Sequence, residues 1–177
     1  MKMEELKKRK TPRHHSFDYN SAGVYFITIC TQDRRCILSR IVVGTGVPDC
    51  PSKDVIACPQ LELSTYGKIA DKYIKQLNEF YHHLSVEHYV IMPNHIHLII
   101  KIAETDGTSG RPSPTGVNAK IPAFIGTFKR FTNKARDCDL WQRSYYDHII
   151  RDETDFIQKI NYIQSNPFRW ADDEYYL

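Results

Sequence analysis

The sequence predicts an α+β domain in which helices pack on one antiparallel sheet whose elements follow the order β-α-β-β-α-β, with one extra C-terminal helix. Three observations support this prediction: a strong strand near the N-terminus, two extended runs joined by a short turn, and apolar residues at helical spacing before and after that pair. With 177 residues, of which 41% are hydrophobic, the chain can bury one core. We therefore expect a single domain spanning residues 1–177.

Four strands are predicted. The first is 23–30, GVYFITIC, whose β-branched and aromatic residues are typical of a buried strand. The runs at 86–92 and 95–102 are joined by Pro93-Asn94 and therefore form a β-hairpin. A short last strand is expected at 144–150.

Three helices are predicted, at about 66–81, at about 119–136, and from the N-cap Asp152 to about Asn166. Each carries apolar residues at helical spacing, which we expect to face the core. These residues are Ile69, Tyr73, Leu77 and Phe80 in the first helix, Ile121, Phe124, Ile125, Phe128 and Phe131 in the second, and Phe156, Ile157, Ile160 and Ile163 in the third. The order of strands and helices is that of the ferredoxin-like fold.

Composition and charge limit the class of protein. The formal net charge is only +3, but basic residues cluster, most clearly in an N-terminal arm at 1–15 that we expect to be flexible. Residues 44–59 and 104–117 are rich in turn formers, so we expect loop insertions there. No run suits a signal peptide or a transmembrane helix, which predicts a soluble, cytoplasmic protein without membrane contact. Five cysteines with no CxxC pair fit neither a disulfide framework nor a tetrahedral zinc site.

Two histidines alternate along the strand 95–102. Because successive side chains of a strand point to opposite faces, His95 and His97 share one face and Ile96 and Leu98 the other. Two neutral imidazoles side by side can hold one divalent cation. A His-x-His pair is also common by chance, so a structural or surface role remains the alternative.

The last helix carries a second candidate pair. Tyr162 and Asn166 are one turn apart and project away from the apolar stripe on a common side, so a core role does not explain Tyr162. Asn166 precedes Pro167 and could simply be the cap that ends the helix. Gln158, one turn before Tyr162, lies on the same side and is an alternative for any role given to Asn166.

Three motifs follow one another along the chain: YVIMPNHIH at 89–97, WQRSYYDHIIR at 141–151 and YIQSNP at 162–167. Together they resemble the single-tyrosine HUH transposases of small insertion sequences, especially their REP-associated branch. The resemblance implies that His95, His97 and Asn166 hold a divalent ion, Mg²⁺ or Mn²⁺, and that Tyr162 is the nucleophile. The insertion-sequence branch usually has glutamine where this chain has Asn166.

The resemblance further implies a DNA transposase or single-strand endonuclease that cleaves and rejoins single-stranded DNA near hairpins through a metal-assisted 5′-phosphotyrosine intermediate. The implied partner is single-stranded DNA with hairpin structure, and the implied location is the cytoplasm, in association with the nucleoid; monomer and homodimer both remain open. Trp141 and Tyr145 either stack on bases or belong to the core. DNA contacts are expected from the N-terminal arm and from Arg34, Arg35, Lys129, Arg130, Arg143 and Arg151.

Two other classes of protein share parts of this pattern. A histidine-triad nucleotide hydrolase requires a third histidine at the position of Ile99, where this chain has none. A non-catalytic or domesticated protein that binds DNA or RNA hairpins on the same fold is the stronger alternative. Metal-supported cleavage separates that alternative from a transposase.

Overall fold

The computed structural model describes residues 22–43, 59–103 and 120–176. The strands are β1 (Gly23–Cys30), β2 (Ser39–Val43), β3 (Pro59–Leu63), β4 (Leu84–Ile91), β5 (His95–Ile102) and β6 (Tyr146–Ile150). The helices are α1 (Thr65–Phe80), α2 (Lys120–Arg136) and α3 (Glu153–Ser165), with two short 3-10 helices, η1 (Gln32–Arg34) and η2 (Trp170–Asp172). The predicted arm at 1–15 and the predicted insertions, except for Pro59, lie outside the described residues.

Four of the strands form one antiparallel sheet in the spatial order β4-β5-β1-β6. Strands β4 and β5 are the predicted hairpin, and β1 lies between β5 and the last strand. This is the ferredoxin-like arrangement that the order of elements predicts, so the predicted fold class is confirmed.

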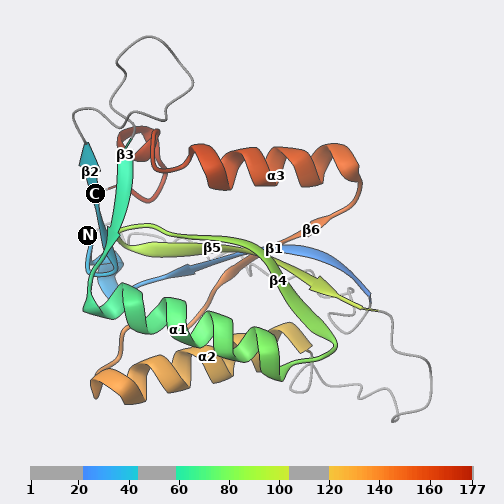
Figure 1. Cartoon of the computed structure of the whole chain (residues 1–177), viewed down its shortest axis with the longest axis horizontal. Helices are drawn as coiled ribbons and strands as arrows, with labels where there is room; N and C mark the ends of the chain where they lie inside the picture. The colour runs from blue at the N-terminus through green and yellow to red at the C-terminus, as the bar shows by residue number, and fades with distance from the viewer. Residues whose placement is uncertain (1–21, 44–58, 104–119, 177) are drawn as a thin grey trace, which may run out of the picture.

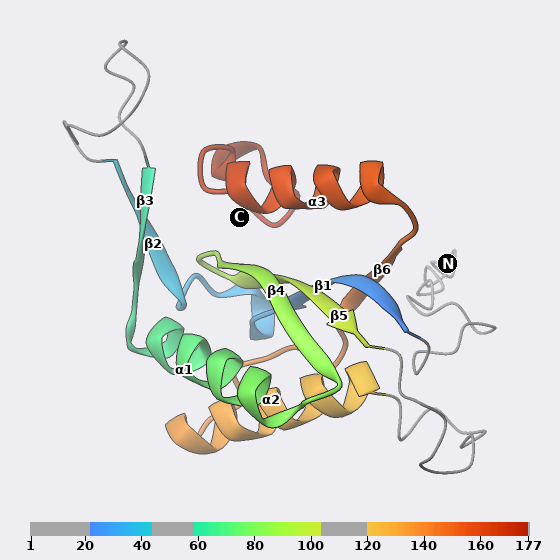
Figure 2. The same cartoon turned by 45° about the vertical axis from the view of Figure 1, so that its right-hand side comes forward.

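The sheet separates two layers of helix. Figures 1 and 2 show α1 and α2 side by side on one face and α3 alone on the other. Alternate residues of β1 serve the two layers, since Tyr25, Ile27 and Ile29 join the large core under α1 and α2, whereas Phe26 joins a smaller cluster with Ile163 of α3. The extra helix therefore covers a sheet face that would otherwise lie open.

Helices α1 and α3 begin at side-chain caps. Ser64 accepts hydrogen bonds from the backbone N–H groups of Tyr66 and Gly67, and the predicted N-cap Asp152 accepts one from Asp155. Such caps satisfy N–H groups that have no partner within the helix. They explain why both helices start within one or two residues of the predicted positions.

The predicted inward face of α1 is partly wrong. Leu77 is buried, but Phe80 is 71% exposed, and the buried positions begin instead at Gly67 and Ala70. The cause is a close approach of α1 to the residue before β2: a Cβ atom at Gly67 would lie 2.1 Å from the carbonyl oxygen of Leu38. That approach turns a small-residue face of the helix inward.

Two further inward assignments are wrong. Phe131 of α2 is 36% exposed, and Ile157 of α3 is 49% exposed. Ile157 is exposed because α3 meets the sheet along a narrow line, and Ile163 is its one buried apolar residue among those described. Periodicity indicates an apolar stripe but not how wide a surface lies opposite it.

A second, two-stranded sheet was not predicted. Strand β2 pairs antiparallel with β3, from Ser39 opposite Leu63 to Val43 opposite Pro59. Pro59, assigned above to the end of a loop insertion, is instead the first residue of β3, a strand position that proline tolerates. None of the helices in the described parts of the chain is long and apolar enough to cross a membrane.

Candidate active site

The site is built on the sheet face that α3 covers. His95 and His97 of β5 both point to that face, while Ile96 and Leu98 lie in the large core on the other. The two imidazoles are 0% and 1% exposed, and their ring centroids are 4.4 Å apart. The strand thus brings the histidines together as the alternation predicts.

Each imidazole is held through its Nδ1 atom. His97 Nδ1 lies 2.8 Å from the hydroxyl of Thr28 on β1, and His95 Nδ1 lies 2.9 Å from Oδ1 of Asn94. Because Nδ2 of Asn94 donates to the carbonyl of Tyr175, its Oδ1 is the acceptor and His95 Nδ1 the donor. A lone pair is then left on Nε2 of His95.

The Nε2 atoms of His95 and His97 are buried and have no hydrogen-bond partner, and the same is true of Oδ1 of Asn166. Burial lowers the pKa of His95 to about 4, an effect that the charge of Asp173 partly opposes. Burial also holds the pKa of His97 well below its usual range, so both rings are neutral near pH 7. Neutral imidazoles with a free nitrogen are what a metal ion requires of histidine.

Tyr162 lies beside the histidines, with its ring centroid 5.1 Å from that of His97 and 5.9 Å from that of Phe26. The expectation that it projects clear of the apolar stripe is wrong, because its half-buried ring packs against the cluster that contains Ile163. Burial, together with the charges of Asp173 and Glu174, raises the pKa of Tyr162 to about 12. The phenol is therefore protonated near neutral pH.

Of the two residues proposed as the third metal ligand, Asn166 lies in the site and Gln158 does not. Asn166 is 2% exposed, its Nδ2 donates to Oδ2 of Asp173 at 2.7 Å, and its Oδ1 faces no partner. Gln158 is exposed. Asn166 keeps right-handed helical geometry (φ −55°, ψ −43°) in spite of Pro167, so its backbone continues the turn and directs its side chain inward.

Asp173 is a site residue that the sequence analysis missed. Single ligand atoms of His95, His97 and Asp173 all lie within 4.8 Å of one another. The carboxylate follows η2, and its Oδ1 accepts the backbone N–H of Tyr175 at 2.7 Å. Residues 172–174 are all acidic, but no spacing relates them to the histidines, so nothing local distinguishes Asp173 from its neighbours.

Three of the six basic residues expected to contact DNA lie near the histidine end of the sheet. Arg34 donates to the carbonyl of Glu174 at 3.2 Å, and its guanidinium lies 5.2 Å from the ring centre of Tyr175. Arg35 is the next residue and is exposed. Arg143 is also exposed and follows Gln142, whose backbone N–H donates to the carbonyl at the end of β1.

The other three basic residues expected to contact DNA are Lys129, Arg130 and Arg151, and their surroundings differ. The ammonium of Lys129 lies 2.8, 3.4 and 3.0 Å from the backbone carbonyl oxygens of residues 142–144, which gives it a role within the fold. Arg130 is exposed on α2, and Arg151 lies at the opposite end of the sheet. Trp141 and Tyr145, at 5% and 9% exposed, belong to the large core, so the core alternative holds for both.

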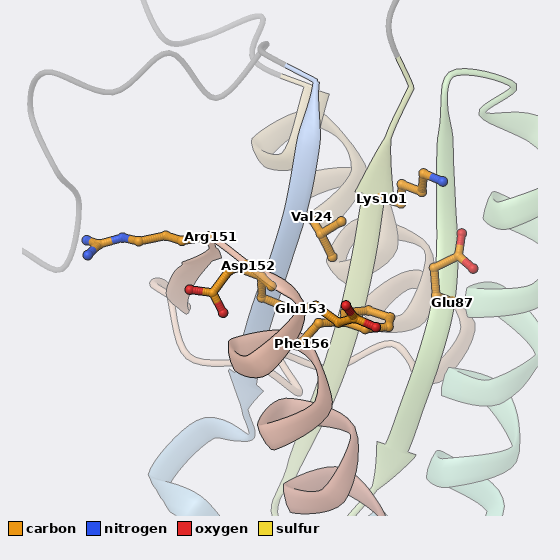
Figure 3. Close-up of a pocket in the computed structure, with 8 residues that line it drawn as sticks. Val24, Glu87, Lys101, Arg151, Asp152, Glu153 and Phe156 are labelled. Carbon is orange, nitrogen blue, oxygen red and sulfur yellow. The ribbon is translucent and has the colours of Figure 1, made fainter.

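Among the described residues, two of the pockets border α3. The larger, of about 410 Å³, lies far from the histidines, where Val24 pairs with Lys101. Figure 3 shows Glu87 and Lys101 on its strand side and the Arg151 side chain extending away from the other residues. This larger pocket is lined by both acidic and basic side chains, and none of its lining residues belongs to the candidate site. The smaller pocket, of about 190 Å³, opens beside Tyr162 and Asn166.

Comparisons with known proteins bear on the family and the fold of the chain. No family model matches the chain. An uncharacterized protein of Haemophilus influenzae is 32% identical over 183 residues, which cover 96% of this chain and 93% of that protein. A second Haemophilus influenzae protein, named as a REP-associated tyrosine transposase, is 26% identical over 162 residues, covering 86% of this chain and 74% of the relative.

One solved structure shows the shared fold. It is that of a REP-associated tyrosine transposase bound to a REP hairpin, with a TM-score of 0.60 and 16% sequence identity. The match covers 90% of this chain and 74% of that chain. At this identity the match shows a shared fold.

Proposed function

Because the chain belongs to the REP-associated branch of the single-tyrosine HUH transposases, we propose that it cleaves and rejoins single-stranded DNA near hairpins through a 5′-phosphotyrosine intermediate. Tyr162 is the nucleophile in this proposal, and His95, His97 and Asn166 bind a divalent ion. One observation carries it: the Nε2 atoms of His95 and His97 and Oδ1 of Asn166 are buried without hydrogen-bond partners, and the ring of Tyr162 lies 5.1 Å from that of His97.

The donor set fits a divalent ion such as Mg²⁺ or Mn²⁺. Two imidazole nitrogens and one amide oxygen are left without protein partners although they are buried, which costs free energy unless a ligand satisfies them. Imidazole ligands favour Mn²⁺ over Mg²⁺. The bound ion would polarise the scissile phosphoryl group and stabilise the charge that develops on it.

Tyr162 supplies the covalent chemistry. Its phenol oxygen loses its proton and bonds to phosphorus, while the bond from phosphorus to the 3′ oxygen breaks, leaving a free 3′-hydroxyl. In the reverse step a 3′-hydroxyl attacks the phosphotyrosine, so strands rejoin without an external energy source. Since Tyr162 contacts His97 of the same chain, we propose that one copy contains a complete site.

The proposed DNA surface lies at the histidine end of the sheet. Arg34, Arg35 and Arg143 are near that end, and the latter two are exposed and available to phosphate groups. Arg130 extends this basic surface along α2. Lys129, which is engaged by carbonyl groups, and Arg151, at the opposite end, contribute less.

The test is a covalent-adduct assay. Wild-type protein, Tyr162→Phe and the control Tyr73→Phe are incubated with Mn²⁺ and labelled hairpin DNA that has native single-stranded flanks, and are then run on a denaturing gel. Tyr73 lies on α1 and packs against the large core on the other face of the sheet, so its variant should form the adduct as wild type does. We expect no adduct with Tyr162→Phe. Hairpin binding without any adduct, across native flanks and both metals, would instead identify a non-catalytic hairpin-binding protein.

A further inference from the structure

The structure points to Asp173 as an additional ligand of the divalent ion, supplying a carboxylate to the site formed by His95, His97 and Asn166. This inference rests on the proposed function, because it concerns the same ion. It adds to that function a residue from the segment after α3, beyond the helix that carries the nucleophile.

The geometry of Asp173 fits such a role. One of its carboxylate oxygens and one nitrogen from each histidine lie within 4.8 Å of one another, a spacing at which one ion can contact all three. The Nε2 atoms of His95 and His97 are without partners, so both histidines can still accept a metal ion.

Several contacts hold the carboxylate in place. Its Oδ1 accepts the N–H of Tyr175, and its Oδ2 accepts Nδ2 of Asn166 at 2.7 Å and the Tyr162 hydroxyl at 3.4 Å. Tyr175 is anchored in turn, because its carbonyl accepts Nδ2 of Asn94 and its ring lies 4.6 Å from that of His95. Hydrogen bonds that orient ligands in this way are typical of metal sites.

Charge gives a second argument. Two neutral imidazoles and one amide carry no negative charge, yet they lie in a site where His95, His97 and Asn166 are at most 2% exposed. Lys159, whose ammonium lies 5.2 Å from the ring centre of Phe26, and Arg34 add positive charge nearby. A divalent cation placed there needs a compensating anion. Mg²⁺ and Mn²⁺ also prefer oxygen ligands, which a carboxylate supplies.

The experiment measures Mn²⁺ binding directly, without DNA, by electron paramagnetic resonance titration of free Mn²⁺. The proteins are wild type, Asp173→Asn, Asp173→Ala, His97→Ala and the control Asp137→Asn. Asp137 is exposed in the turn after α2, and its positive φ of 50° is one that asparagine tolerates. Asp137→Asn therefore makes the same charge change at a residue outside the site, and thermal melts in EDTA are used to test whether each variant is folded.

We expect Asp173→Asn and Asp173→Ala to weaken Mn²⁺ binding at least tenfold, with Asp137→Asn within twofold of wild type. If His97→Ala abolishes binding while both Asp173 variants bind like wild type, Asp173 is not a ligand and the proposed function stands. If wild type itself binds no Mn²⁺, the metal-dependent function fails, and this inference fails with it. If one of the two Asp173 variants does not fold, the Mn²⁺ affinity of the other variant tests the inference.

Discussion

The ring of Tyr162 stands edge-on to the imidazole of His97, with 5.1 Å between their centroids and 63° between their planes. Their elements, α3 and β5, are separated in sequence by α2 and β6, and the contact exists because α3 folds back across the sheet (Figure 1). Phe26 touches both rings from β1, at 5.0 Å from His97 and 5.9 Å from Tyr162. The proposed nucleophile and metal ligand are thus placed by one small apolar cluster.

Replacing Thr28 by valine should weaken Mn²⁺ binding about tenfold, the lower end of the effect expected when a hydrogen-bond partner of a metal-binding histidine is lost. The Thr28 hydroxyl is 2.8 Å from Nδ1 of His97, so the variant leaves that ring without its orienting contact. Thr28→Ser keeps the hydroxyl and should bind Mn²⁺ as wild type does. Equal Mn²⁺ affinity in the valine and serine variants, measured by titration, would show that the hydroxyl does not orient the ring.

The two glycines within helices should respond oppositely to alanine. At Gly67 a Cβ atom would meet the Leu38 carbonyl oxygen at 2.1 Å, so Gly67→Ala should lower the free energy of unfolding by about 2 kcal/mol or more. At Gly126 a Cβ atom would meet nothing within 4 Å. Gly126→Ala should therefore raise the free energy of unfolding by about 0.5–1 kcal/mol, the helical preference of alanine. Urea denaturation measures both, and stabilisation by both variants would contradict the close approach.

Asp71 should make stability depend on pH. Burial opposes its ionisation, but hydrogen bonds from Lys75 and Tyr89 outweigh that effect and hold the pKa of Asp71 below its usual value. A carboxylate whose pKa is lower in the folded state stabilises above the unfolded pKa, about 3.9, and loses that contribution as the pH falls through the folded pKa. Asp71→Asn should therefore cost about 1–2 kcal/mol at pH 7.

The cost of Asp71→Asn should shrink as the pH falls below about 4, where the wild-type carboxyl also becomes protonated. Urea denaturation of both proteins at pH 7 and pH 3 measures the change. Asp137→Asn, at an exposed position, serves as the control for a general effect of charge. A cost for Asp71→Asn that is the same at both pH values would mean that the ionised form of Asp71 has no stabilising role.

Arg143→Gln should weaken binding of hairpin DNA several-fold at low salt and lower the slope of log affinity against log salt concentration by about one, as expected for one lost phosphate contact. Arg143 is exposed near the histidine end of the sheet, whereas Arg151 lies at the opposite end. Arg151→Gln makes the same charge change and should alter affinity less. A salt titration by fluorescence anisotropy compares the two, and a larger effect at Arg151 would place the DNA at the other end.

Local patterns in the sequence determined the strands of the main sheet, the three long helices and their order along the chain, but not the strands β2 and β3. The period of two in 95–102 is enough to place His95 and His97 on one face, because it depends only on the geometry of the strand. The cap Asp152 likewise predicts the start of α3, since its hydrogen bond is made within one turn. The family motifs added the expected roles of Tyr162 and Asn166, which the adduct and metal-binding experiments test.

The tertiary structure alone decided what lies opposite each face. Thr28 reaches His97 across 69 positions of sequence, and Asn94 meets Tyr175 across 81. The same holds for Asp173, whose place beside the histidines depends on how α3 and η2 fold back over the sheet. A local period indicates which side of an element a residue occupies, but the partner on that side is set by packing between distant segments. For that reason the sequence predicted the histidine pair, whereas the carboxylate beside it emerged only from the folded chain.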